Sequence, residues 1–354
     1  MDASKLIRRL SVSGRGGKKT TFILSIDGGG IRGLIPSIIL DRLEKVISEK
    51  RGVETRIAEI FDMVAGTSTG SIIALGLTVS EEDNNSKPKY PASTLVDIYE
   101  KEKDKIFDRI FYPLRLFYPR FKPGKFERLL NDYFTRKNNE VCKLSEHIVK
   151  GVHVLVPSYN ITSKEHVFFN NYSDKFRTTR DYTKFTIPDV IRASTAAPTY
   201  FPAKKINGEH YIDGGVFMNN PSYFAYRDAK RILKAEEYVI CSLGTGHYQE
   251  ELGQLINGGL GNWALPIISL TMNSSSKLAE EYFHDDNKDK DPNKLVYDFR
   301  YYPLRPSLKR DTPLDDTGEE SMKSLREEAE KCINDKVFNE LVQRILEDKF
   351  DIKD

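Results

Sequence analysis

The stretch of sequence that decides the fold covers residues 60–77 and reads Ile60-Phe61-Asp62-Met63-Val64-Ala65, Gly66-Thr67-Ser68-Thr69-Gly70, Ser71-Ile72-Ile73-Ala74-Leu75-Gly76-Leu77. The first part is an apolar run typical of a strand, and the last part can begin a helix. The middle part reads Gly-x-Ser-x-Gly, in which glycines permit a sharp turn and the hydroxyl of Ser68 stands clear of it. This context predicts a nucleophilic serine, and the alternative is a glycine-rich turn with a surface serine.

A second glycine-rich loop, Asp27-Gly28-Gly29-Gly30-Ile31-Arg32-Gly33, comes earlier in the chain. It follows residues 21–26, an expected buried strand, and precedes residues 34–50, whose apolar side chains recur at helical spacing. Two successive strand–loop–helix units predict an α/β fold with a largely parallel sheet. Consecutive glycine amides in such a loop can point at one spot and stabilise an oxyanion.

The same loop also satisfies the Gly-x-Gly-x-x-Gly pattern of dinucleotide-binding proteins between Gly28 and Gly33. That interpretation needs an acidic residue about twenty positions further on, at the end of the second strand, to bind a ribose hydroxyl. The second expected strand ends instead beside Ser68, and the nearest acidic residues, Glu44 and Glu49, fall on the expected helix. The sequence therefore favours an oxyanion-binding role for this loop, and nucleotide binding is the less favoured alternative.

Composition limits the class of protein. The chain has 354 residues, of which 39% are hydrophobic and 30% charged, with a formal net charge of +2. A chain of this length and composition can bury a sizeable core, and its small net charge indicates no nucleic-acid partner. The sequence contains no apolar run as long as a membrane span. We expect residues 1–20 to be a flexible basic tail without a secretory signal, and residues 21–354 to form a single domain. The three scattered cysteines are typical of a reducing cytosol and show no metal-ligand spacing.

Residues 107–126 combine aromatic and basic side chains, and three prolines exclude one continuous helix. Aromatic rings can lie in the headgroup layer of a bilayer while cations bind the phosphates. We therefore expect a membrane contact formed by Arg115, Phe117, Tyr118, Arg120, Phe121 and Lys122. The alternative is that the rings cover the core while the basic groups face water.

A nucleophilic serine needs a general base. None of the six histidines lies in a glycine-framed turn, so no local signal assembles a Ser-His-Asp triad. Asp213, in Asp213-Gly214-Gly215 after a short expected strand, is the better candidate. The alternative for this motif is an ordinary Asp-Gly turn.

The glycine loop, the Ser68 turn and the Asp213 turn, in this order, resemble the patatin-like phospholipases. Residues 196–202 and 242–246 also resemble internal landmarks of that family. The resemblance implies a three-layer α/β/α fold with a central, mainly parallel sheet. It also implies Ser68 as nucleophile, Asp213 as base, Gly66 and Gly70 as the glycines of the nucleophile turn, and an oxyanion hole formed by Gly28, Gly29, Gly30, Ile31 and Arg32.

The function that the resemblance implies is hydrolysis of the acyl esters of membrane glycerophospholipids, with galactolipids as a further candidate, and without metal or cofactor. We accordingly expect a cytoplasmic protein that associates peripherally with membranes when active. A catalytically silent lipid-binding or regulatory protein with the same fold is the alternative from another functional class. The intact Ser68 and Asp213 argue against it.

Overall fold

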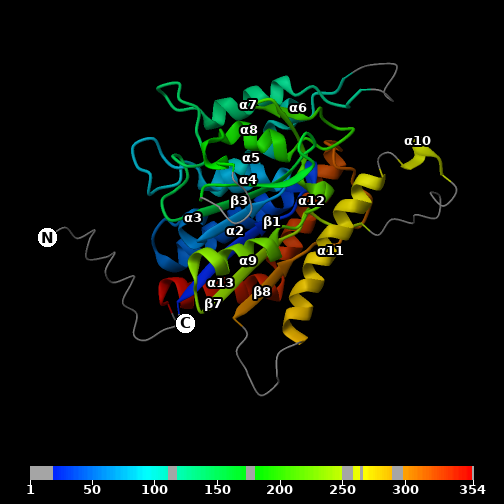
Figure 1. Cartoon of the computed structure of the whole chain (residues 1–354). Helices are drawn as coiled ribbons and strands as arrows, with labels where there is room; N and C mark the ends of the chain where they lie inside the picture. The colour runs from blue at the N-terminus through cyan, green and yellow to red at the C-terminus, as the bar shows by residue number, and fades with distance from the viewer. Residues whose placement is uncertain are drawn as a thin grey trace.

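A single sheet of eight strands forms the centre of the computed structural model, which describes residues 19–110, 118–172, 180–248, 258–263, 266–288 and 298–352 (Figure 1). The strand order is β5-β6-β3-β2-β1-β7-β8, and β4 pairs with β3. The neighbouring strands β3, β2, β1, β7 and β8 are parallel to one another. Strands β4 and β6 pair with β3 in antiparallel fashion, and β5 pairs with β6 in the same way. The strands are β1 (Thr20–Ile26), β2 (Met63–Gly66), β3 (His153–Asn160), β4 (Glu165–Asn170), β5 (Lys204–Ile206), β6 (Glu209–Asp213), β7 (Glu237–Leu243) and β8 (Phe299–Leu304).

Helices cover the sheet. The α-helices are α2 (Leu34–Arg51), α3 (Ile57–Ile60), α4 (Thr69–Thr78), α5 (Ala92–Lys101), α6 (Lys103–Ile106), α7 (Gly124–Phe134), α8 (Ile187–Ser194), α9 (Ser222–Leu233), α10 (Leu260–Trp263), α11 (Pro266–Lys288), α12 (Glu319–Ile333) and α13 (Lys336–Phe350). Among the described residues, three short 3-10 helices, η1 (Gly30–Gly33), η2 (Tyr182–Lys184) and η3 (Gly214–Val216), lie in the connections. No helix in the described ranges is long and apolar enough to cross a membrane.

The central strands divide the apolar core into two parts because successive side chains point to opposite faces of a sheet. Phe22 and Leu24 of β1 pack in one cluster with side chains of α2, α4, α12 and α13. Ile23, between them, packs in a second cluster with Ala225 and Tyr226 of α9 and with Phe283 of α11. The predicted three-layer α/β/α architecture with a mainly parallel sheet is thereby confirmed.

The two predicted strand–loop–helix units are present, as β1 followed by η1 and α2, and as β2 followed by α4. Helices α12 and α13 are separate, because Asp335 accepts a hydrogen bond from the Val337 amide and begins α13. Strand β8 begins at Phe299, and residues 295–297 lie outside the described ranges.

The prediction of a lipid contact at residues 107–126 needs one correction. Phe121 is completely buried against Phe107 and Phe201, so its ring belongs to the core and not to a lipid-facing surface. Tyr118 is 57% exposed, and Lys122 is exposed as well. Arg120, partly buried, forms an ion pair with Asp315 at 3.1 Å. The predicted contacts Arg115 and Phe117, like residues 1–18 of the predicted tail, lie outside the described residues.

Candidate active site

The turn between β2 and α4 places Ser68 in a conformation that non-glycine residues rarely adopt, with φ 53° and ψ −121°. The two flanking glycines make room for it. A Cβ atom at Gly66 would lie 2.1 Å from the Gly70 carbonyl oxygen, and one at Gly70 would lie 2.3 Å from the Ile26 carbonyl oxygen. The sharp turn, and with it the direction of the Ser68 hydroxyl, therefore depends on both glycines.

Asp213 comes to Ser68 from the end of β6, 145 residues later in the chain. The Ser68 hydroxyl donates a hydrogen bond of 2.6 Å to Oδ2 of Asp213. The other carboxylate oxygen, Oδ1, accepts a hydrogen bond of 2.7 Å from the Gly215 amide. The carboxylate is thus oriented by its own turn and presents one oxygen to the serine.

Burial raises the pKa of Asp213 to about 7, because an ionised carboxylate loses hydration in a buried position. The hydrogen bonds from Ser68 and Gly215, and the positive charge of Arg192, act in the opposite direction and limit the rise. Arg192 is itself 1% exposed and lies 3.4 Å from a carboxylate oxygen of Glu127. A carboxyl group with a pKa near neutrality is suited to accept a proton from a hydroxyl at neutral pH.

A second serine holds the turn in place. The Ser68 amide donates to Oγ of Ser194 at 3.0 Å, and the Ser194 hydroxyl donates to the Pro157 carbonyl oxygen at 2.8 Å. Sequence reasoning missed Ser194, which lies at the end of α8, immediately before the landmark at residues 196–202. Its proximity to that landmark was the available signal.

The five predicted oxyanion residues differ in what their amides already bind. Three amides donate to carbonyl oxygens of the chain, namely Gly28 to Asn219 at 3.1 Å, Ile31 to Leu314 at 2.8 Å and Arg32 to Gly29 at 3.1 Å. Among the described residues, no hydrogen bond engages the amides of Gly29 and Gly30. Gly30 lines the same pocket as Ser68 and Asp213, and Gly29 precedes it in the loop, so these two amides are the candidates to bind a ligand there.

An apolar pocket, partly open to solvent, adjoins the serine and the aspartate. Met272 of α11, which sequence reasoning did not single out, contributes to its wall. The lining residues are Gly30, Ser68, Thr69, Ile72, Tyr99, Ile106, Phe107, Phe126, Thr195, Ala197, Tyr200, Phe201, Asp213, Met272 and Leu314, with no histidine among these described residues. The predominance of hydrocarbon suits a fatty acyl chain.

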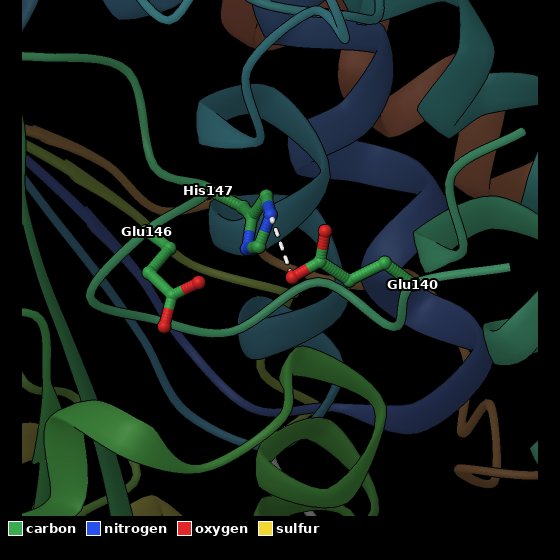
Figure 2. A group of neighbouring side chains, drawn as sticks. All are labelled: Glu140, Glu146 and His147. Carbon is green, nitrogen blue, oxygen red and sulfur yellow. Dashed lines mark ion pairs between the residues drawn. The ribbon is translucent and has the colours of Figure 1, made fainter. Parts of the chain in front are cut away.

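A separate cluster of Glu140, Glu146 and His147 has the composition of a metal site (Figure 2). The geometry does not fit one. Nδ1 of His147 accepts a hydrogen bond of 2.9 Å from the Lys143 amide, so the neutral ring carries its proton on Nε2, the nitrogen that lies 3.9 Å from Glu140. Burial lowers the pKa of His147 and favours this neutral form, which has no lone pair left for a cation.

Comparison with known proteins gives the class to which this fold and site belong. The chain matches the family model for patatin-like phospholipase over residues 24–226. It is 31% identical over 297 residues to "Patatin-like protein 2" of Arabidopsis thaliana, covering 74% of this chain and 70% of the relative. It is 28% identical over 302 residues to "Patatin-like protein 2" of Oryza sativa subsp. indica, covering 74% and 72%. It is 29% identical over 245 residues to the "cGAMP-activated phospholipase" of Vibrio cholerae serotype O1, covering 64% and 65%.

The chain therefore belongs to the patatin-like phospholipase family. The resemblance inferred from its three motifs is confirmed, and lipid acyl hydrolysis is the general activity that the family indicates.

Proposed function

We propose that this protein is a lipid acyl hydrolase that cleaves fatty acyl esters of membrane glycerophospholipids, with galactolipids as the second substrate class to test. The observation that carries the proposal is the hydrogen bond of 2.6 Å from the Ser68 hydroxyl to Asp213 beside an apolar pocket. A hydroxyl, a proton acceptor and a site for hydrocarbon are the groups that ester hydrolysis of a lipid requires.

In the proposed reaction, Oγ of Ser68 attacks the ester carbonyl carbon while its proton passes to Oδ2 of Asp213. The alcohol part of the lipid leaves with that proton, and the acyl group remains on the serine as an ester. A water molecule then attacks this ester, Asp213 takes the proton of the water, and Ser68 regains it as the fatty acid is released. One carboxyl group thus acts as base and then as acid in each half of the reaction.

The proposed oxyanion hole consists of the amides of Gly29 and Gly30. The oxygen of the tetrahedral intermediate is negatively charged, and the loss of one donor at such a site costs about a hundredfold to a thousandfold in turnover. The other predicted members, Gly28, Ile31 and Arg32, use their amides to hold the loop.

The substrate is proposed to lie in a membrane, to which the protein binds peripherally. The two sides of α11 support this arrangement. Met272 lines the pocket, whereas Ile267, Leu270 and Leu278 are exposed hydrophobic residues of the same helix. Apolar side chains beside a lipid pocket can enter the interfacial layer of a bilayer.

The decisive experiment compares the intact protein with Ser68→Ala and Asp213→Asn. Products released from mixed phospholipid and galactolipid vesicles are identified by mass spectrometry, and Ser68 is titrated with a fluorophosphonate. We expect labelling and fatty acid release by the intact protein alone, and a loss of at least about a hundredfold in Asp213→Asn, the lower range for general-base catalysis. The Asn variant keeps the shape of the side chain but cannot take the proton.

Six single His→Gln variants are the matched controls, because a histidine base is the rival mechanism. Each should retain turnover. A folded His→Gln variant as inactive as Asp213→Asn would replace the proposed pair by a triad. Vesicle binding by the intact protein without labelling or product would instead favour the silent lipid-binding alternative.

A further inference from the structure

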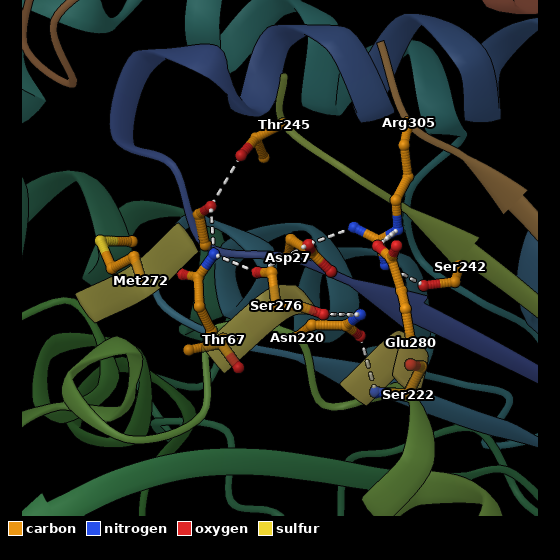
Figure 3. A network of polar contacts seen from close by, with 12 residues as sticks. Asp27, Thr67, Asn220, Ser222, Ser242, Thr245, Met272, Ser276, Glu280 and Arg305 are labelled. Carbon is orange, nitrogen blue, oxygen red and sulfur yellow. Dashed lines mark hydrogen bonds and ion pairs between the residues drawn. The ribbon is translucent and has the colours of Figure 1, made fainter. Parts of the chain in front are cut away.

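Two side chains from distant parts of the chain, Thr245 and Asn219, bind the carbonyl oxygen of Gly28. Figure 3 shows Thr245 among the polar side chains of this region. The Thr245 hydroxyl donates to this oxygen at 2.7 Å, and Nδ2 of Asn219 donates at 3.3 Å. Both side chains are buried, with exposures of 4% and 5%. Two donors on one carbonyl oxygen fix the direction in which that carbonyl points.

The direction of the Gly28 carbonyl also determines the direction of the next amide. The described residues contain no cis peptide bond, so the C=O of Gly28 and the N–H of Gly29 lie in one plane and point in opposite directions. Because the carbonyl points at Thr245, the Gly29 N–H points away from Thr245. This amide is one of the two that no hydrogen bond engages among the described residues.

The register of the sheet explains why Thr245 is in reach. Ile26 of β1 pairs with Leu243 of β7, and the Asp27 amide continues the ladder with a hydrogen bond of 3.0 Å to the Leu243 carbonyl oxygen. Gly28 and Thr245 each follow this pair by two residues. The contact is close, since a Cβ atom at Gly29 would lie 2.2 Å from Oγ1 of Thr245.

We propose that Thr245, assisted by Asn219, is a positioning residue that aims the Gly29 amide at the oxyanion of the reaction. Thr245 touches no reacting atom and acts through the peptide bond between Gly28 and Gly29. The inference rests on the proposed function, because the Gly29 amide matters in this way only if Ser68 forms a tetrahedral intermediate. It gives a role to the residue at the centre of Gly244-Thr245-Gly246, which the catalytic groups leave unexplained.

The test compares Thr245→Val, which keeps the shape but removes the hydroxyl donor, with Thr245→Ser, which keeps the donor. Hydrolysis of a short-chain nitrophenyl ester gives kcat and KM, and a trifluoromethyl ketone, which forms a charged tetrahedral adduct with serine, gives a binding constant. We expect Thr245→Val to lose about tenfold or more in kcat and in ketone affinity, up to the hundredfold typical of losing one oxyanion donor, with little change in KM. Thr245→Ser should restore both quantities.

Thr78→Val is the matched control. The Thr78 hydroxyl is buried and donates 2.7 Å to the Ala74 carbonyl oxygen at the far end of α4, so its loss affects folding without reorienting the loop. Unchanged kcat and ketone affinity in Thr245→Val would overturn the inference, as would equal losses in Thr78→Val or failure of Thr245→Ser to recover. These outcomes are distinct from failure of the proposed function, in which the intact protein itself would not hydrolyse the ester through Ser68.

Discussion

Burial of Asp213 suits its carboxyl group for catalysis, but it also makes the ionised form less stable than it would be in water. Only the ionised carboxylate can accept the serine proton, and the pKa of Asp213 is raised to about 7. We expect kcat/KM for a short-chain ester to rise about tenfold per pH unit below this value and to level off above it. A profile measured between about pH 5 and pH 9 checks this, and a flat profile across the interval would exclude a buried carboxylate as the base.

The stability of the protein should show the opposite trend. In the unfolded chain Asp213 has its ordinary pKa of 3.8, whereas in the folded chain the pKa is about 7. Between these values the folded state binds more protons, so the contribution of Asp213 to stability falls as pH rises through this window. Asp213→Asn removes the buried charge and should therefore unfold at a higher temperature than the intact protein at about pH 8, with a smaller difference near pH 4. The reverse pH trend in the difference between the two melting temperatures would contradict this prediction.

The sequence predicted residues whose chemistry is tied to a local glycine pattern, and missed those that act through tertiary contacts. Ser68 and Asp213 stand in short motifs, and the structure brings them within hydrogen-bonding distance. Ser194 and Asn219 bind backbone groups of distant segments, and no local pattern marks such contacts. The prediction of a membrane contact at Phe121 was wrong, because its ring is buried. A sequence of aromatic and basic residues is the same whether the rings face lipid or the core.

At the scale of elements, Asp27, the buried residue after β1, forms an ion pair with Arg305, the residue after β8, beside β7 and α11. Nη1 of Arg305 lies 2.6 Å from Oδ2 of Asp27, and Nη2 donates to the Ser242 hydroxyl at 2.6 Å. Arg305 also pairs with Glu280 of α11 at 2.5 Å (Figure 3). Burial raises the pKa of Asp27, and the positive charge of Arg305 opposes that rise. Arg305 therefore stabilises the ionised form of the Asp27 carboxylate.

Arg305→Met should destabilise the fold, because it leaves the Asp27 carboxylate buried without its cation. We expect the free energy of unfolding to fall by about 3 kcal/mol, the lower end for breaking a buried pair, and Asp27→Asn in the same chain to recover part of it. Denaturant unfolding measures both. The control is Arg300→Met on β8. The Arg300 side chain is 55% exposed, so its pair with Glu237 should contribute less than about 1 kcal/mol. Equal losses in the two arginine variants would show that burial of the Asp27 pair has no special effect.

Elements with strongly apolar sequences could be predicted, and elements with mixed sequences could not. The buried strands β1 and β7 are nearly continuous apolar runs. Helix α9 was not predicted, because the apolar side chains that it packs in the second core cluster are interrupted in the sequence by charged residues such as Arg227 and Asp228. The packing partner that completes this short apolar face is visible only in the folded chain.

At the scale of the whole molecule, the proposed binding to a bilayer can be tested at the exposed apolar side chains of α11. Ile267 is 50% exposed and Leu278 47%, and burial of such side chains in a bilayer contributes about 1.5 to 3 kcal/mol each. Changing Ile267, Leu270 and Leu278 together to Gln should weaken binding to phospholipid vesicles by at least about tenfold. Hydrolysis of a short-chain soluble ester should stay unchanged, because these side chains do not line the pocket.

A matched control changes exposed apolar residues elsewhere. Val53, after α2, and Ile161, after β3, are 52% and 43% exposed. Vesicle sedimentation should show no loss of binding for Val53→Gln with Ile161→Gln. Equal losses of vesicle binding in this control and in the α11 variant would contradict the prediction that α11 binds the bilayer. A parallel loss of soluble-ester turnover in the α11 variant would contradict it as well.

The pairing of β1 with β7 has a consequence for synthesis on the ribosome. Thr245, whose hydroxyl binds the Gly28 carbonyl oxygen, lies 217 positions downstream of it. A nascent chain stopped before residue 237 contains Ser68, Asp213 and the whole glycine loop, yet it lacks one of the two strands that flank β1. We expect such arrested chains not to react with a fluorophosphonate, while chains extended past residue 305 do. The order of translation would then keep Ser68 unreactive toward ester substrates until the segment around residue 305 has been made.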